Sequence, residues 1–184
     1  MNIVLAKNSG FCFGVRRAYE KAAELARDKS KKIFTVGNLI HNKNVIRELE
    51  NMGVYAVEPE NLADAVERAD ENTVFIIRAH GAPKEITIML EDASAKKHFE
   101  FIDCTCPFVK KIHDIMDANS NDNTFTFLYG DENHPEVKGI SSHIKGDKFI
   151  FKTEAELCEK ISSGTLPPPE TTVITAAQTT QNSE

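Results

Sequence analysis

The stretch Val74-Phe75-Ile76-Ile77-Arg78-Ala79-His80-Gly81-Ala82-Pro83 indicates the architecture of the whole chain. Its first four residues are an unbroken apolar run, which is typical of a parallel strand that is buried on both faces. The run leads into a loop that contains His80 and Gly81, and Pro83 suits the first turn of a helix. A strand that passes through a polar loop into a helix is the repeating unit of a parallel α/β sheet.

The same unit recurs along the chain. The pattern of apolar residues predicts helices over residues 15–26, 44–52, 61–69, 83–95 and 153–161, with a further helix starting at Pro107. Strands are expected at residues 3–6, 32–36, 54–57, 74–77, 99–103, 124–129, 149–151 and 173–176. This alternation predicts an α/β protein made of repeated parallel-sheet lobes, whose strand-to-helix loops converge on a central site.

Composition excludes several classes of function. The 184 residues carry a net charge of -6, so no broad basic face is available for the phosphates of nucleic acid. No apolar run has the length that a bilayer-spanning helix needs, and no basic-then-apolar signal segment begins the sequence. We therefore expect a cytoplasmic protein that binds neither nucleic acid nor membrane. In a reducing cytoplasm, four cysteines favour metal or redox chemistry over disulfides.

Two of these cysteines lie in strand-to-helix turns. Cys12 stands between Gly10 and Gly14, just before a predicted helix, and Cys106 precedes the helix that starts at Pro107. A thiol at a helix N-terminus is favoured as a thiolate, which makes it either a nucleophile or a metal ligand; the alternative is a small buried apolar residue. The two sulfurs could converge on one iron–sulfur cluster or one zinc ion. Cys104 is expected to be structural, and Cys158 an ordinary core or surface thiol.

Other polar residues follow predicted strands in the same way, at the edge where parallel sheets bind ligands. Three histidines in such loops suggest a site for a phosphate or diphosphate. Glu136 is a candidate proton donor, or else a first-turn glutamate that favours the helix dipole. Thr179 is a hydrogen-bond donor or a helix cap. The residues concerned are Cys12, His41, His80, Cys106, His134, Glu136 and Gln178-Thr179-Thr180.

Taken together, these motifs resemble the LytB/IspH family of 4-hydroxy-3-methylbut-2-enyl diphosphate reductases. The matching motifs occur in the family's order: Gly10-Phe11-Cys12-Phe13-Gly14-Val15, Ile40-His41-Asn42, Ala79-His80-Gly81, Thr105-Cys106-Pro107 with Val109-Lys110-Lys111-Ile112-His113, His134-Pro135-Glu136-Val137-Lys138-Gly139, and Gln178-Thr179-Thr180. The resemblance implies the last step of the non-mevalonate isoprenoid pathway. In that step the substrate loses its 4-hydroxyl with two electrons and two protons, giving isopentenyl and dimethylallyl diphosphate.

The resemblance also assigns roles. It implies an oxygen-sensitive 4Fe–4S cluster that Cys12 and Cys106 help to hold, and a ferredoxin or flavodoxin as electron donor. His41, His80 and His134 are implied to bind the diphosphate, while Glu136 relays protons with support from Thr179, which also contacts substrate. The family has three lobes. Residues 1–13 are implied to belong to the third lobe, 14–105 to form the first and 106–184 the second.

One departure from the family stands out. The sequence ends at Glu184, just after the Gln-Thr-Thr motif, whereas the family's third cysteine and its later serine and asparagine ligands lie beyond that point. We expect a truncated chain that binds a cluster poorly and is inactive alone. Two alternatives stay open: a non-enzymatic α/β module that binds zinc through Cys12 and Cys106, and a thiol-dependent phosphate-handling enzyme with Cys12 as the nucleophile.

Overall fold

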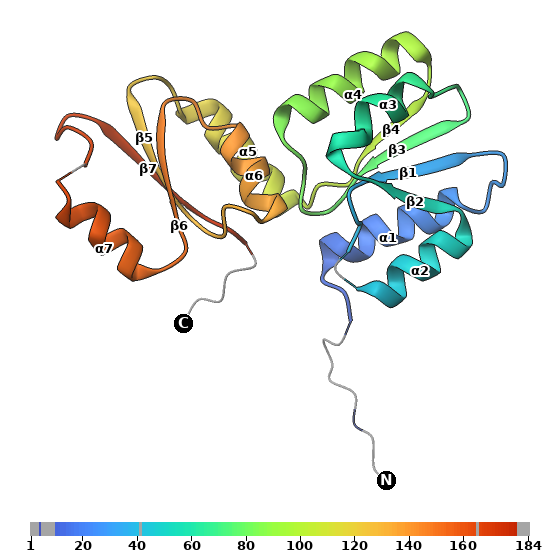
Figure 1. Cartoon of the computed structure of the whole chain (residues 1–184), viewed down its shortest axis with the longest axis horizontal. Helices are drawn as coiled ribbons and strands as arrows, with labels where there is room; N and C mark the ends of the chain where they lie inside the picture. Colours follow the sequence, from blue (N-terminus) through green and yellow to red (C-terminus); the bar gives the residue numbers. More distant parts are fainter. Residues whose placement is uncertain (1–3, 5–9, 41, 165, 180–184) are drawn as a thin grey trace. The chain divides into compact units, whose positions relative to one another are not determined.

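Helices and parallel strands alternate along the chain, from α1 (Phe13–Leu25) to β7 (Thr172–Ala177), as Figure 1 shows. The computed structural model describes residues 4, 10–40, 42–164 and 166–179. They form two compact units: the first contains the described residues up to Ala79 together with Lys97–Cys106, and the second contains the rest. The strands pair in parallel in both units, which confirms the expected α/β class. The lobe boundaries after residues 13 and 105 stay predictions.

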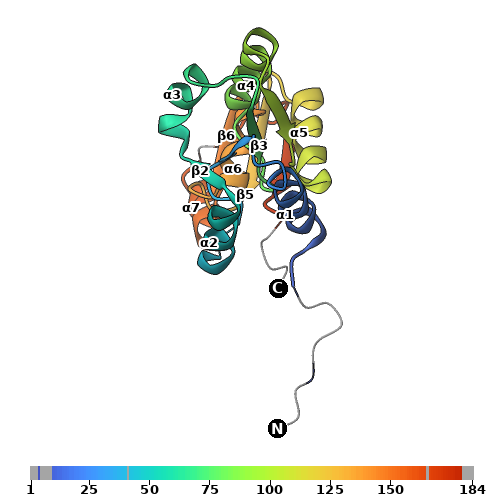
Figure 2. The same cartoon turned by 90° about the vertical axis from the view of Figure 1, so that its right-hand side faces the viewer.

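The first unit is built on a sheet in the order β2 (Val54–Val57), β1 (Lys32–Val36), β3 (Thr73–Ile77) and β4 (Glu100–Asp103). Every residue of β3 is buried, as its unbroken apolar run predicts. Helices α1 and α2 (Lys43–Met52) cover one face, and both views place α3 (Leu62–Glu67), with the short turn η1 (Pro59–Asn61) before it, on the other (Figure 1, Figure 2). Ala18 and Ala22 of α1 pack in one core with Ile33 and Ile76 of the sheet.

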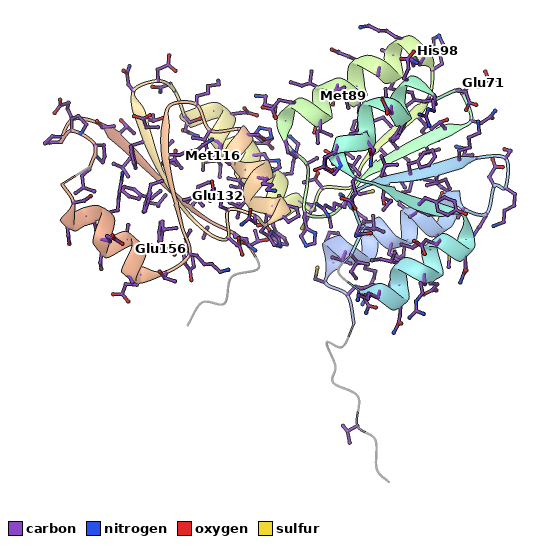
Figure 3. The ribbon with its side chains drawn as sticks, viewed as in Figure 1. Glu71, Met89, His98, Met116, Glu132 and Glu156 are labelled. Atoms are coloured by element: carbon purple, nitrogen blue, oxygen red, sulfur yellow. The ribbon has the colours of Figure 1, made fainter. Side chains whose placement is uncertain are left out.

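The second unit contains a sheet in the order β6 (Asp147–Phe151), β5 (Thr124–Tyr129) and β7. Helices α5 (Pro107–Asn119) and α6 (Pro135–Ser142) pack on it, and Met116 of α5, labelled in Figure 3, lies in the core with Leu128 and Ile140. Helix α7 (Glu154–Ser162) begins where the Thr153 hydroxyl accepts a hydrogen bond from the Glu156 N–H. Helix α4 (Lys84–Lys97) belongs to this unit up to Lys96.

Local sequence signals account for several boundaries. Gly53 ends α2 with a φ of 96°, a conformation that glycine adopts without strain. His98 follows α4 with a φ of 63° and is exposed (Figure 3). The strand expected over residues 3–6 lies outside the described residues except for Val4, which is exposed. Among the helices that the structure describes, none has both the length and the apolar character needed to cross a bilayer.

Candidate functional site

The two cysteine turns meet in the first unit. Cys12 is the N-cap of α1, and a Cβ atom added to Gly14 would lie 2.8 Å from both the Cβ and the Sγ of Cys106. Real side chains do not tolerate that approach, so only a glycine lets α1 begin against Cys106. Two residues of chain span at most about 7 Å, so the Cα atom of Cys12 lies within that distance of the Cα atom of Gly14.

The backbone of the second turn is held in place by hydrogen bonds within the same unit. The Asp103 Oδ1 atom accepts from the Thr105 N–H at 2.8 Å and from the Thr105 hydroxyl at 2.5 Å. The Cys106 N–H donates to the Ala79 carbonyl at 2.9 Å. These bonds fix the direction in which the chain leaves β4, and so determine where the Cys106 side chain starts.

The other two cysteines differ from this pair, in agreement with the sequence. Cys104 is 3% exposed and packs in the core of the first unit. Burial raises the pKa of its thiol, and this outweighs the opposing effect of the nearby Arg17 charge. Cys158 is exposed on α7, in the second unit. Neither has the environment of a reactive or metal-binding thiol.

His80 and His134 come together in the second unit. Their rings lie edge to face with centroids 5.3 Å apart, although 54 positions separate them in the sequence. His134 is the N-cap of α6, and its Nδ1 atom accepts a hydrogen bond from the Glu136 N–H at 3.2 Å. Since Nδ1 accepts, the neutral ring carries its proton on Nε2, where it can donate to an anion. His41 and Thr180 lie outside the described residues.

Glu136 is the least exposed of the predicted polar candidates, with none of its surface accessible to solvent. One carboxylate oxygen, Oε1, accepts a hydrogen bond from the Thr179 N–H at 2.5 Å. The other, Oε2, is buried and has no hydrogen-bond partner among the described residues. A buried oxygen of this kind is a binding position for a water or for a polar group of a ligand. Glu136 also stands in the first turn of α6, so the helix-dipole reading holds as well.

Thr179 is positioned through its neighbour. The Gln178 Oε1 atom accepts from the Asp131 N–H at 3.1 Å, and Gly130 packs directly against the Gln178 side chain. These contacts hold the end of β7 beside the loop that leaves β5. Thr179 was expected as a hydrogen-bond donor or a helix cap, and it is its main-chain N–H that donates to Glu136.

Two histidines that were given no role in the site, His113 and His143, pack against each other. His113 of α5 is 4% exposed and stacks on His143 with ring centroids 4.3 Å apart. Asp117 accepts from His143 at 2.7 Å and from the Lys84 ammonium at 2.5 Å. Burial opposes the charge on Asp117, but these two bonds outweigh it and hold its pKa below the usual value.

The close approach of α6 to α5 was not predicted. Gly139 of α6 lies against His113, since an added Cβ would be 3.2 Å from its Nε2 atom. A glycine in the interior of a short helix, just before the apolar Ile140, is the signal that could have indicated this contact.

The donor chemistry of the first unit suits a soft metal centre in part. Thiolates are the ligands of iron–sulfur clusters, and the missing Cβ of Gly14 makes room for the Cys106 side chain itself. No group of three His, Cys, Asp or Glu side chains suited to a metal ion occurs in the described part of the chain. Cys12 and Cys106 therefore fit two positions of a cluster, and further ligands have to come from elsewhere. In the second unit, imidazoles beside a helix N-terminus suit an anion.

Known proteins are similar to this chain in sequence and in fold. The family model described as LytB protein matches residues 3–184. A 4-hydroxy-3-methylbut-2-enyl diphosphate reductase from Geotalea daltonii is 40% identical over 184 residues, covering 100% of this chain and 58% of the relative. The protein of that name from Aquifex aeolicus is 34% identical over 187 residues, with 100% and 58% covered. The chain thus spans little more than half the length of these curated relatives.

Two solved structures are also similar. One is an (E)-4-hydroxy-3-methyl-but-2-enyl diphosphate reductase, described as the terminal enzyme of the non-mevalonate pathway, with a TM-score of 0.70 and 33% identity over 98% of this chain and 59% of its own. The other is the E-1-hydroxy-2-methyl-but-2-enyl-4-diphosphate reductase of Plasmodium falciparum, with a TM-score of 0.75 and 28% identity over 96% of this chain and 51% of its own.

Proposed function

This chain belongs to the LytB family, and from that premise we propose that it supplies the first part of a 4-hydroxy-3-methylbut-2-enyl diphosphate reductase. The substrate class is a small allylic diphosphate, which loses its 4-hydroxyl as water while it takes up two electrons and two protons. The observation that carries this proposal is the contact between Gly14 and Cys106, because it brings both cysteine turns of the family motif to one place.

Cys12 and Cys106 would hold two irons of a 4Fe–4S cluster through their sulfurs. When bound, that group supplies the electrons and a Lewis-acidic iron for the substrate hydroxyl. The chain's own contribution is to present the two sulfurs from turns with fixed backbones. A ferredoxin or flavodoxin would deliver the electrons, and a third cysteine would have to come from outside the residues given.

The residues of the second unit would bind and protonate the substrate. His80 and His134, with His41, would hold the diphosphate, since imidazole N–H groups and a helix N-terminus both favour phosphate oxygens. Glu136 would deliver a proton from Oε2, the oxygen that no described residue occupies, while the Thr179 N–H holds its Oε1. The fixed carboxyl orientation is what a proton donor requires.

A chimera tests this function. Residues 1–184 replace the matching part of the Geotalea daltonii relative, and the protein is reconstituted without oxygen from iron and sulfide. We expect iron and sulfide in the ratio of a 4Fe–4S cluster, an absorbance lost in air, and turnover of 4-hydroxy-3-methylbut-2-enyl diphosphate. Cys106→Ser should remove the cluster and the turnover.

Three results would contradict the proposal. A folded chimera that holds a cluster but does not turn over the substrate would exclude this reaction. Zinc bound at one equivalent by Cys12 and Cys106 of the chain, with no iron taken up, would favour the zinc module. Turnover that persists in a metal-free sample and stops when Cys12 is alkylated would favour the thiol-dependent enzyme.

A further inference from the structure

Arg17 connects the two cysteine turns of the first unit. It lies in the second turn of α1, five residues after Cys12, and its Nη2 atom donates to the Thr105 carbonyl at 2.7 Å. Thr105 directly precedes Cys106 and is 88 positions away from Arg17 in the sequence. The first main-chain hydrogen bond of the helix, from the Arg16 N–H to the Cys12 carbonyl at 2.9 Å, ties Cys12 to the same helix.

The Arg17 bond attaches the turn that carries Cys106 to α1, which the other contacts of this turn do not do. Asp103 and Ala79 hold the Thr105–Cys106 backbone to the sheet and to the loop after β3, so neither of these residues connects the turn to α1. Gly14 allows α1 to approach Cys106 but does not attract it. Among the side-chain hydrogen bonds of the described residues, the Arg17 bond alone joins the helix that begins after Cys12 to the turn that carries Cys106.

The charge of Arg17 suits the same position. Its guanidinium lies 2.7 Å from the Thr105 carbonyl, so the positive charge lies close to this turn. Its Nε atom is buried and has no hydrogen-bond partner among the described residues. A buried cationic donor without an acceptor is unfavourable, and cysteine sulfurs that bind a metal centre at this turn would offset that cost.

We propose that Arg17 is the positioning residue of the two-cysteine site: it locks the Cys106 turn onto α1 so that the two sulfurs face one ligand, and its charge offsets theirs. The inference rests on the proposed role of Cys12 and Cys106 as ligands. Arginine suits this role better than lysine, because its planar fork holds a carbonyl in a fixed direction while a second N–H stays available.

The chain itself can be tested with phenylarsine oxide, an arsenical that bridges two nearby thiols. Its oxygen leaves as water while two As–S bonds form, and nothing is oxidised or reduced. The background carries Cys158→Ser, which removes the exposed thiol of the second unit. We expect one arsenic per chain by mass spectrometry, joined to Cys12 and Cys106 in the peptide map. Competition with dimercaptopropanol then measures how tightly it is held.

Arg17→Met should weaken the retention of arsenic about tenfold, the factor that corresponds to one charge-assisted hydrogen bond of about 1.4 kcal/mol. Arg16→Met is the matched control, since Arg16 is exposed on the same helix and its loss changes net charge equally; it should have no effect. Arg17→Lys keeps the charge but not the planar guanidinium, so its retention of arsenic should lie between those of Arg17→Met and Arg16→Met. If Arg17→Met does not fold, Arg17→Lys and Arg17→Gln carry the comparison.

The outcomes separate this inference from the proposed function. If the unaltered chain forms no bridge between Cys12 and Cys106, the two-cysteine site itself is wrong. If the bridge forms but Arg17→Met, Arg17→Lys and Arg16→Met all retain arsenic equally, the site stands and the role of Arg17 is refuted. A bridge that involves Cys104 in place of Cys12 would also refute it, because Arg17 would then hold the wrong pair.

Discussion

The cysteine turns of the first unit and the Glu136 region of the second unit are built in opposite ways. Around Cys106, the contacts hold the main chain of the turn, through the Asp103 and Arg17 side chains, the Ala79 carbonyl and the absence of a side chain at Gly14, and Cys12 itself is exposed. Around Glu136, the functional group is fully buried and is held by a main-chain N–H from β7.

The difference follows from what each region would do under the proposed function. A thiol that receives a metal centre must be open until that centre binds, so the protein fixes the backbone and leaves the sulfur accessible. A carboxyl that transfers a proton must point in one direction, so the protein buries it and binds one of its oxygens. Preorganisation therefore lies in the backbone in one region and in the side chain in the other.

The largest effect should come from the carboxyl of the second region. In the chimera, Glu136→Gln keeps the size of the side chain but removes the acid, so turnover should fall by about 10²–10⁴. The unfolding midpoint should stay close to that of the parent. Glu132→Gln is the matched control, since Glu132 is exposed in the loop just before His134 (Figure 3). If Glu136→Gln keeps a turnover within a factor of ten of the parent, the Glu136 carboxyl is not the proton donor of the reaction.

A pair of glycine substitutions compares the two regions directly. Gly14→Ala should destabilise the chain by about 1–3 kcal/mol, because the new Cβ would overlap Cys106 at 2.8 Å. Gly139→Ala should change stability by less than about 1 kcal/mol, because the gain in helix propensity offsets the contact with His113 at 3.2 Å. Urea unfolding monitored by circular dichroism measures both. Equal effects would mean that α1 does not depend on the missing side chain.

The next effect separates the buried thiol from the exposed one. Cys104→Ser should cost about 1–3 kcal/mol, because Cys104 is 3% exposed and a hydroxyl there would be buried in an apolar core. Cys158→Ser should stay within about 0.5 kcal/mol, because it is a substitution on an exposed face of α7. Thermal unfolding of both variants gives the comparison. A Cys158→Ser variant that loses more than Cys104→Ser would reverse the assignment of core and surface.

The smallest effect is a pH dependence that belongs to the second unit. The folded pKa of Asp117 is depressed, so its charge stabilises the fold above its unfolded pKa near 3.8, and this contribution is lost as the pH falls through the lower folded value. Asp117 is partly exposed, so the contribution should be on the order of 1 kcal/mol or less. The stability difference between the parent and Asp117→Asn should therefore be constant at neutral pH and shrink below about pH 4. A difference that grows toward acid pH would contradict this sign.

Periodicity and turn chemistry predicted most of the elements. The buried run at β3 and the stop at Gly53 follow from residues that are adjacent or nearly adjacent in sequence, where local physics decides. A helix after His134 was expected only as one interpretation of Glu136, without bounds, and the structure gives it as Pro135–Ser142; β6 begins at Asp147 instead of residue 149. The pairing of Asp147 with Phe125 extends β6, and a strand 22 residues away cannot be read from the local pattern.

The candidate site was predicted unevenly for the same reason. The motif residues could be picked out because parallel strands place their exit loops at one edge. The partners of those residues could not, because the bond from Arg17 to Thr105 depends on a contact across 88 positions. The stacking of His113 on His143 is likewise a product of the packing of α5 and α6.

By itself, the sequence determined the alternation of strands and helices, the positions of the reactive side chains in their turns and the membership of the family. These follow from short-range periodicity and from motifs in a fixed order. Only the tertiary structure decided that Cys106 touches the first turn of α1 and that the Thr179 N–H holds Glu136. Such contacts depend on how buried surfaces pack, and packing is a property of distant residues acting together.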